Sequence, residues 1–366
     1  MPNPPTTILD LPLEQNPDPE EFIQAAMEWH FSPETGSPFW LKRADSLDFG
    51  PRKDVTSFAD LTLFPNIANE LRDVPVRELI PQGYGPNPQV VGVYESGGTT
   101  GAPKRVVFLQ DWVDKVIAWQ NVYLDERGIP RDLDWLLVSP NGPHAIGDLM
   151  GRQAVSRGGI AFTIDMDPRW VKKVIAAGKA DEAAAYVEHL TEQAAFALRT
   201  QDISVLMTTP PLLERLARDD ELAELIRRKV KAILWGGSHM DPDTRDLLRD
   251  EVFPDTALYG FYGSNMVLGS SIERLALTDD DPCVFDPPTP WITYSVVDPV
   301  TGQPVPYGER GQVVMNHVSK SFLLPNNLER DLAIRVTAPQ GAVGDSVADI
   351  SPVATFGNET VIEGVY

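Results

Sequence analysis

Cysteine is almost absent from the 366-residue sequence, whose single example is Cys283. One cysteine excludes an intramolecular disulfide and a Cys-x-x-Cys metal site. The sequence also lacks any run of 18 apolar residues, so it predicts no membrane-spanning helix. Its first residues form neither a basic segment nor an apolar core, so we expect no signal peptide and a cytoplasmic location.

Basic residues are scarce as well, with 31 Lys and Arg against 53 Asp and Glu and a formal net charge of −22. Such a charge repels nucleic acid and anionic membrane surfaces, so neither is expected as a partner. An anionic small ligand would need a local positive site. Hydrophobic residues make up 42% of the chain, which indicates a globular protein. The sequence leaves open whether the protein forms a homodimer.

The pattern of predicted secondary structure changes twice along the chain. Residues 1–88 are rich in proline and predict short helices, whereas residues 89–278 alternate apolar strands with amphipathic helices. Residues 279–366 lose helical periodicity and predict β-structure. We therefore expect the α/β class, with mixed or parallel sheets covered by helices and a β-rich C-terminal subdomain. Within the middle segment, residues 210–229 predict one helical stretch with proline near its start.

A polar, glycine-rich segment separates two predicted strands. It consists of Ser96, Gly97, Gly98, Thr99, Thr100, Gly101, Ala102, Pro103 and Lys104. Glycines allow backbone amides to approach a phosphate, hydroxyl groups donate hydrogen bonds, and the lysine supplies charge for a departing pyrophosphate. A Gly-Lys-Ser/Thr ending is missing, so this is not a Walker loop. A plain glycine-rich hairpin is the alternative interpretation.

This segment resembles the phosphate loop of the AMP-forming adenylating superfamily, the acyl-CoA synthetases and adenylation domains. Gly97 is the one departure, because a hydroxyl residue is usual there. From about residue 50 onward the chain is similar to the phenylacetate–CoA ligase-like branch, in particular to short members that activate aromatic acids for phenazine- and benzoxazole-type antibiotics. The resemblance implies the large N-terminal core of an adenylate-forming enzyme, with ATP as substrate, AMP as product and Mg²⁺ as the accompanying ion.

Two later segments match the superfamily in the same order. The first resembles its adenine-binding turn and comprises Gly236, Gly237 and Ser238, for which an ordinary strand-to-helix turn is the alternative. The second resembles its tyrosine–glycine segment and comprises Tyr259, Gly260, Phe261, Tyr262, Gly263, Ser264, Asn265 and Met266. Met266 takes the position of a glutamate that normally helps to hold Mg²⁺. Because a thioether binds a hard cation poorly, we assign no residue as a metal ligand.

The resemblance also implies residues around the acid and the ribose. His144 and Gly147 match the carboxylate pocket, and Lys104, His144 and Thr99 are the implied catalytic residues; a capping or packed ring is the alternative for His144. Either Asp331 or Asp345 matches the aspartate that binds the ribose hydroxyls. We favour Asp331, because an Arg-Asp-Leu sequence recurs in phenylacetate–CoA ligase-like proteins.

The apolar residues near the adenine segments bear on the acid. Trp235, Phe261 and Met266 would form flat walls suited to an aromatic acid, with plain core packing as the alternative. We therefore expect ATP-dependent activation of an aromatic carboxylic acid to an acyl-adenylate with release of pyrophosphate. Transfer to an amine, a hydroxyl or the thiol of CoA would follow, in secondary metabolism.

Three alternatives to this function stay open. Family members continue past the ribose aspartate into a hinge and a mobile lid that carries a lysine, and we expect this chain to lack that lid. A chain without the lid and the metal-binding glutamate could be a pseudoenzyme that binds AMP or an acyl-adenylate. An aryl-CoA ligase is the second alternative. A kinase is the third, and the missing Gly-Lys-Ser/Thr sequence disfavours it.

Overall fold

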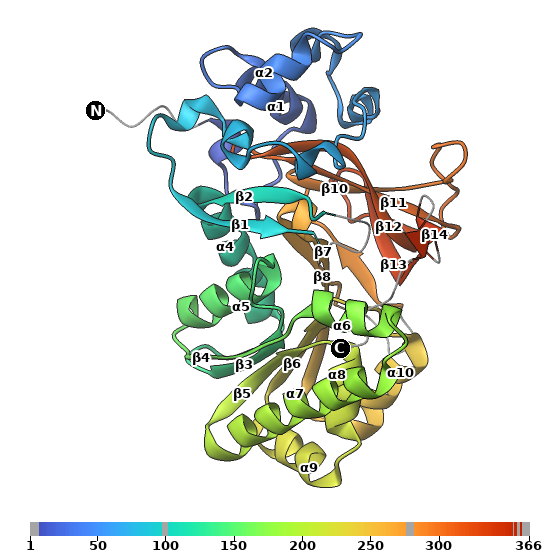
Figure 1. Cartoon of the computed structure of the whole chain (residues 1–366). Helices are drawn as coiled ribbons and strands as arrows, with labels where there is room; N and C mark the ends of the chain where they lie inside the picture. The colour runs from blue at the N-terminus through green and yellow to red at the C-terminus, as the bar shows by residue number, and fades with distance from the viewer. Residues whose placement is uncertain (1–6, 97–101, 276–281, 354, 357–358, 361–366) are drawn as a thin grey trace.

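The computed structural model of the chain describes residues 7–96, 102–275, 282–353, 355–356 and 359–360. Short helices at the N-terminal end lie above a large central sheet, and the remaining helices lie mostly along its lower half (Figure 1). Among the described residues, no helix is long and apolar enough to cross a lipid bilayer.

The N-terminal segment consists of short helical pieces, as its proline content predicts. The three α-helices begin at proline, whose fixed φ suits the first helical position. Phe22 of the first helix packs edge-on against Trp291, with ring centroids 5.1 Å apart, so this segment is anchored on the β-rich part. The elements are α1 (Pro19–Phe31), α2 (Pro38–Ala44) and α3 (Pro51–Asp54), with the 3₁₀ turns η1 (Ile8–Asp10), η2 (Phe58–Leu63), η3 (Glu70–Arg72), η4 (Val76–Leu79) and η5 (Gln82–Tyr84).

Five parallel strands form one half of an 11-stranded sheet, in the order β4-β3-β5-β6-β7. Most of their residues are buried, as expected for strands with helices on both faces. The predicted alternation of strands and helices between residues 89 and 278 is confirmed. The strands are β3 (Asp134–Ser139), β4 (Ala161–Asp165), β5 (Ile203–Thr208), β6 (Ala232–Gly236) and β7 (Ala257–Ser264).

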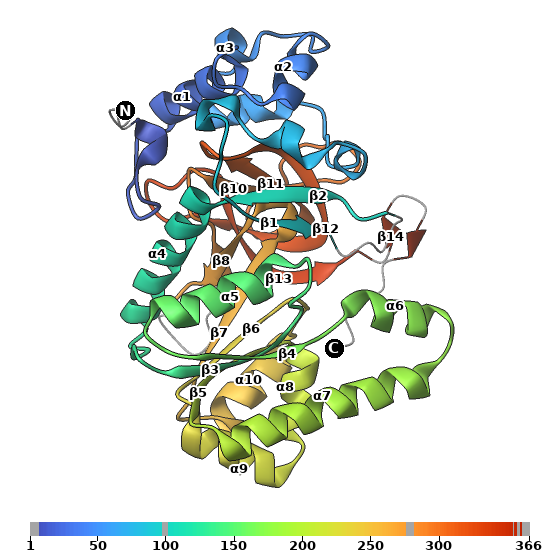
Figure 2. The same ribbon diagram turned by 60° about the vertical axis from the view of Figure 1, so that its left-hand side comes forward.

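Helices cover both faces of these parallel strands, with α4 and α5 on one side and α7, α8 and α9 on the other (Figure 2). The single helical stretch predicted for residues 210–229 is two helices. Asp219 interrupts it, because its side chain accepts hydrogen bonds from the amides of Glu221 and Leu222 at 3.0 and 3.1 Å and so begins a new helix. The helices are α4 (Gln110–Glu126), α5 (Ala145–Ser156), α6 (Pro168–Ala176), α7 (Ala180–Thr200), α8 (Pro210–Ala217), α9 (Asp220–Lys229), α10 (Pro242–Asp246) and the π-helix η6 (Leu247–Val252).

Antiparallel strands continue the same sheet beyond β7, in the order β8-β9-β13-β12-β11-β10. A further pairing between Tyr294 and Asp345 brings β10 against β13, so the last four strands curl back on themselves. One sheet therefore runs through both the α/β segment and the β-rich C-terminal segment that the sequence predicts. Its mixture of parallel and antiparallel strands confirms the predicted fold class. The elements are η7 (Asn265–Val267), β8 (Gly269–Glu273), β9 (Val284–Asp286), β10 (Ile292–Val297), β11 (Arg310–Val318), β12 (Leu323–Thr337), β13 (Asp345–Pro352), β14 (Thr355–Phe356) and β15 (Glu359–Thr360).

The glycine-rich segment connects two strands, β1 (Val90–Glu95) and β2 (Arg105–Leu109), which pair as an antiparallel hairpin outside the large sheet. Both predicted strands are confirmed. Two hydrogen bonds close the base of the connection: the Ser96 amide donates to the Lys104 carbonyl at 3.0 Å, and the Lys104 amide donates to Ser96 Oγ at 3.1 Å. The residues at its centre, Gly97, Gly98, Thr99, Thr100 and Gly101, lie outside the described part of the chain.

Candidate active site

Two neighbouring cavities lie at the carboxyl ends of the parallel strands. The first has a volume of about 290 Å³ and the second about 310 Å³. Ser139, Gly236 and Ser264, the last residues of β3, β6 and β7, line the second cavity. This edge of an open α/β sheet is where ligands usually bind, because the loops that follow the strands diverge there.

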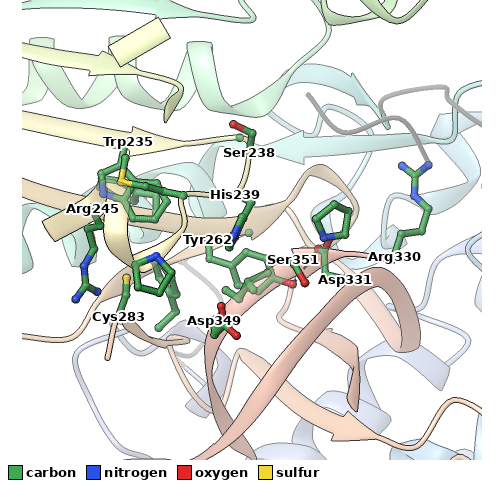
Figure 3. Close-up of a pocket in the computed structure, with 18 of the residues that line it drawn as sticks. Trp235, Ser238, His239, Arg245, Tyr262, Cys283, Arg330, Asp331, Asp349 and Ser351 are labelled. Carbon is green, nitrogen blue, oxygen red and sulfur yellow. Dashed lines mark hydrogen bonds between the residues drawn. The ribbon is translucent and has the colours of Figure 1, made fainter. Parts of the chain in front are cut away.

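Aromatic rings form much of the first cavity. The Phe285 ring lies 6.1 Å from Trp235 and 5.9 Å from Tyr262, measured between centroids. Figure 3 shows Trp235 at one end of the cavity with Arg245 and Cys283, and Arg330 at the other end. The rings therefore provide a flat apolar surface that suits a planar heterocycle.

Tyr262 and Asp331 meet in the middle of the first cavity (Figure 3). The Tyr262 hydroxyl donates a hydrogen bond to Asp331 Oδ2 at 3.0 Å. Burial raises the pKa of Tyr262 well above its usual value, and the nearby Asp331 carboxylate raises it further. The phenol therefore stays protonated and orients the carboxylate.

Two polar atoms of residues that line the first cavity are buried without a partner. Trp235 Nε1 and Ser238 Oγ have no hydrogen-bond partner among the described residues. A buried polar group that stays unpaired costs about 1–3 kcal/mol, so such groups usually mark an unplaced ligand or water. Trp235 lies near the end of β6, and Ser238 belongs to the turn after it that resembles the adenine-binding turn.

Glycine is required at two positions around the first cavity. A Cβ on Gly260 would lie 2.6 Å from Trp235 Cζ2 and 2.9 Å from Phe285 Cζ, so a larger residue would displace both rings. Gly237, which lines both cavities, has a φ of +84°, a conformation that side-chain-bearing residues rarely adopt. The backbone at both sites is thus fitted to the cavity wall.

Positive charge gathers along the second cavity in this otherwise acidic protein. Arg72, Lys104, Lys172 and Arg330 line it, together with the carboxylate of Glu329. Burial lowers the pKa of Lys104; Arg72 and Arg330 lower it further, whereas Glu329 opposes the shift. This is the local positive site that an anionic ligand needs.

The second cavity also has an apolar set of lining residues. Phe261 and Met266 line it, as do Met207, Leu149 and Met150. His144 lies at the same cavity, and burial lowers the pKa of its imidazole, with Arg169 as a further cause. The ring is therefore neutral near pH 7 and can accept or donate a hydrogen bond.

Asn265 connects the hairpin to the helix that follows β3. Its Oδ1 accepts a hydrogen bond from the Ala145 amide at 3.2 Å, and its Nδ2 donates to the Glu95 carbonyl at 2.7 Å. Ala145 is the first residue of α5, and Glu95 ends β1 directly before the glycine-rich segment. Asn265 therefore fixes where that segment begins relative to the second cavity.

Among the described residues, four of the site residues predicted from the sequence lie outside the lining of both cavities: Gly147, Tyr259, Gly260 and Asp345. Asp345 accepts hydrogen bonds from the Val296 amide at 3.1 Å and from Arg335 Nε at 2.9 Å. A Cβ on Gly147 would lie 2.3 Å from Asn141 Oδ1, so this glycine serves close backbone packing. The Tyr259 ring instead contacts the Arg127 guanidinium, 5.0 Å from its centroid.

Sequence reasoning missed three cations of the second cavity, Arg72, Lys172 and Arg330. Arg330 directly precedes Asp331, so its place beside a ribose-binding candidate was available as a signal. Lys172 sits in an amphipathic helix next to Lys173, and nothing in the sequence distinguishes the two. Arg72 lies far from the loop in sequence, and its Nε donates to the Ala102 carbonyl at 3.0 Å only in the folded chain.

The donor atoms around the cavities do not fit a resident metal ion. Among the described residues, no group of three or more His, Cys, Asp or Glu side chains could hold one. Glu329 is the carboxylate of the second cavity, and Met266 presents a thioether there. Mg²⁺ prefers several oxygen ligands, which this set of side chains does not supply.

The fold and the two cavities define an α/β protein with a candidate ligand site at the carboxyl ends of its parallel strands, and comparison with known proteins shows what the chain is similar to. Residues 183–319 match the family described as AMP-binding enzyme. The chain is 26% identical over 279 residues to phenylacetate–coenzyme A ligase of Pseudomonas putida, an alignment that covers 74% of this chain and 56% of the relative. The chain is therefore similar to AMP-binding enzymes and to a phenylacetate–CoA ligase, as the sequence motifs predict.

Solved structures show the same fold. A 2-hydroxyisobutyryl-CoA ligase in the postadenylation state, in complex with R3-HIB-AMP, has a TM-score of 0.63 at 16% identity, covering 90% of this chain and 66% of that one. An open conformation of this ligase, with 2-HIB-AMP and CoA, has a TM-score of 0.62 at 16% identity, covering 92% and 69%. This chain thus spans between half and about two thirds of the length of these relatives.

Proposed function

We propose that the protein binds ATP across the two cavities and joins its AMP portion to a carboxylic acid. The observation that carries this proposal is the continuity of an aromatic cavity with a cationic one at the same sheet edge, through Gly237, Phe261 and Gly263. In the reaction a carboxylate oxygen bonds to the α-phosphorus while the bond from that phosphorus to pyrophosphate breaks. No proton moves, so the barrier is set by anion repulsion and positioning.

The nucleoside fits the first cavity. Adenine would lie against the aromatic surface of Trp235 and Phe285, where Ser238 Oγ supplies a hydrogen-bonding group. The ribose hydroxyls would donate to Asp331, which Tyr262 holds in place. This arrangement supports Asp331 rather than Asp345 as the ribose ligand, because Asp345 is paired with Arg335 outside the cavity.

The triphosphate would run from the first cavity toward the hairpin. Lys104 and the amides of the segment 96–104 would bind the departing pyrophosphate, with Ser96 at the start of that segment. Lys104 is held partly buried by the hairpin, so its charge is screened less by water than that of a surface lysine. Positively charged, preorganised groups of this kind stabilise the charge that develops in the transition state.

The acid would occupy the apolar part of the second cavity. Phe261, Met266 and Met207 offer flat or adaptable apolar contacts, and His144 offers a polar one. A volume of about 310 Å³ supports a compact aromatic acid over a long acyl chain. The likeness to CoA ligases supports transfer to the CoA thiol, with amine and hydroxyl acceptors as alternatives. A place in antibiotic biosynthesis and in the cytoplasm stays a prediction from the sequence alone.

Acid-dependent pyrophosphate exchange tests this function. The chain would be incubated with ATP, magnesium and labelled pyrophosphate, with benzoates, phenylacetate, phenazine acids or fatty acids added one at a time. We expect exchange with at least one aromatic acid and weaker exchange with fatty acids. Mass spectrometry with and without CoA then separates adenylate, thioester, amide and ester. Exchange with fatty acids alone would overturn the aromatic assignment.

A non-catalytic nucleotide-binding protein is the second candidate function. Met266 favours it, because the thioether stands where the superfamily keeps a metal-binding glutamate and lines the second cavity. Such a protein would bind AMP yet show no acid-dependent exchange with any acid. Titration calorimetry with AMP, run beside the exchange assay, distinguishes the two.

A further inference from the structure

The two cavities meet at a small set of residues. The residues that line both are Lys172, Gly237, Phe261, Gly263 and Arg330. Lys172 and Arg330 are the members of this set that carry charge. Any ligand that extends from the aromatic cavity into the cationic one must therefore pass these two side chains.

Helix α6 holds Lys172 at this meeting point. Val171 and Val174 are buried on the side of the helix that packs into the protein. Trp170 packs on Tyr186 of α7, with ring centroids 5.1 Å apart, and so fixes the helix further. Figures 1 and 2 both draw α6 near the end of β13, across from the β-rich part of the sheet. Lys173, the next residue, is exposed and lines neither cavity.

Among the residues that the structure describes, Lys172 has no acidic partner that would explain its burial. Its side chain is half-buried, and among the described residues no hydrogen bond or ion pair is formed by its Nζ. Burial lowers the pKa of Lys172 to about 8, and the positive charge of Arg330 is the second cause. The ammonium group is still mostly protonated at pH 7, in a place that disfavours its charge. A bound anion would remove this disadvantage, since an opposite charge favours the protonated form.

We propose that Lys172 binds the anionic centre of the ligand, where the α-phosphate of the nucleotide and the carboxylate of the acid come together. The inference rests on the proposed function, because that function places the reacting phosphorus between the two cavities. This role differs from that of Lys104, which lines only the second of the two cavities and would bind the outer phosphates. Lys172 would reduce the repulsion between the two reacting anions.

Binding of AMP compared with adenosine tests this inference without any turnover. The two ligands differ by the phosphate, so their affinity ratio reports on the phosphate site alone. We expect Lys172→Met to weaken the binding of AMP by about 10- to 100-fold, which is the range for a hydrogen bond to a charged group. The affinity for adenosine should stay unchanged. Lys172→Arg should recover most of the loss. Lys173→Met, on the same helix and exposed, is the matched control and should behave as the unaltered chain.

Pyrophosphate exchange provides the second readout. We expect Lys172→Met to lower kcat/KM for exchange by about 100-fold, while the melting temperature stays level or rises because a partly buried charge is removed. Equal AMP affinity in Lys172→Met and the unaltered chain would overturn the inference, whatever the exchange assay shows. A variant that loses adenosine binding and melting temperature together would overturn it too, since that result indicates a structural role.

The same measurements separate this inference from the proposed function. If the unaltered chain binds AMP but catalyses no acid-dependent exchange, the proposed function fails and the AMP-to-adenosine ratio still decides the role of Lys172. If the unaltered chain binds AMP no more tightly than adenosine, both are wrong. If exchange is present and Lys172→Met exchanges normally with normal AMP affinity, the function stands and the inference is wrong.

Discussion

The Tyr262 hydroxyl donates a 3.0 Å hydrogen bond to Asp331 Oδ2, although 69 residues separate the two in the chain. Tyr262 lies on β7, the last parallel strand, and Asp331 on β12 of the antiparallel half. The ribose site that we propose is therefore assembled from both halves of the sheet. Its integrity depends on the way the two halves pack together.

Asp331→Asn is predicted to weaken ATP and AMP binding by about 10- to 100-fold, because an amide is a poorer acceptor for two ribose hydroxyls than a carboxylate. Tyr262→Phe should weaken binding less, since it removes only the group that orients the carboxylate. Titration calorimetry with AMP measures both changes. Asp345→Asn is the contrasting variant.

We expect Asp345→Asn to leave AMP affinity unchanged and to lower the free energy of unfolding. Asp345 is buried and paired with Arg335 Nε at 2.9 Å, and loss of one partner of a buried pair typically costs about 3 kcal/mol. Urea denaturation measures this loss. The reverse pattern, weak AMP binding with normal stability in Asp345→Asn, would assign the ribose to Asp345 instead.

Lys104→Ala should reduce acid-dependent pyrophosphate exchange by about 100- to 1,000-fold and leave the melting temperature nearly unchanged. The lysine side chain is partly buried at the second cavity, and burial lowers its pKa, so its removal relieves an unfavourable charge. Arg105→Ala is the matched control, because Arg105 is exposed, pairs with Glu95 at 2.9 Å and lines neither cavity. Comparable losses of exchange in both variants would contradict a specific role for Lys104.

The sequence predicted the parallel half of the fold well, because its strands and helices have strong and distinct periodicities. The strands β3, β5 and β6 are apolar runs between amphipathic helices, and the structure places them side by side. The break at Asp219 was missed, since an aspartate inside a helical pattern is compatible with both a continuous helix and a new start. In the structure the Asp219 side chain accepts hydrogen bonds from the amides of Glu221 and Leu222, which shows that a new helix begins there.

The candidate site was predicted where motifs are contiguous and missed where the fold brings distant segments together. Gly237 and Tyr262 lie on motifs that resemble the superfamily, and both line a cavity. Lys172 and Arg72 come from other segments, and their proximity depends on how α6 and the N-terminal segment pack. Gly147 lies in a matching motif, yet the space around its Cα indicates a packing role that no motif could reveal.

Gly147→Ala is predicted to destabilise the fold by about 1–3 kcal/mol, the usual cost of overpacking. A new Cβ would lie 2.3 Å from Asn141 Oδ1 and 2.4 Å from the Pro140 carbonyl oxygen, and the carbonyl belongs to the backbone. Gly151→Ala, one helical turn later, is the control, since its Cβ would meet only Leu137 Cδ1 at 3.8 Å. Urea denaturation compares the free energies of unfolding of the two variants. Equal values would show that the loop before α5 moves to make room for the new Cβ.

Acidification is predicted to destabilise the protein through two buried histidines near Ser319. His30 Nε2 donates to the Ser319 carbonyl at 2.6 Å, and His317 Nδ1 donates to the Val267 carbonyl at 2.5 Å. Burial lowers the pKa of His30 to about 4 and that of His317 to about 3. Both rings are therefore neutral in the folded protein over a range in which the unfolded chain binds protons.

Stability should fall as the pH drops below about 6.5, the usual pKa of histidine, and continue to fall toward pH 4 for His30 and toward pH 3 for His317. Each histidine contributes a slope of about 1.4 kcal/mol per pH unit inside its window. His30→Gln keeps a donor for the Ser319 carbonyl and cannot titrate, so the slope between pH 6 and pH 4 should flatten by about that amount. His189→Gln, at an exposed position, is the control and should keep the original slope. Urea unfolding at a series of pH values measures the difference, and equal slopes for the two variants would show that His30 is protonated in the folded protein.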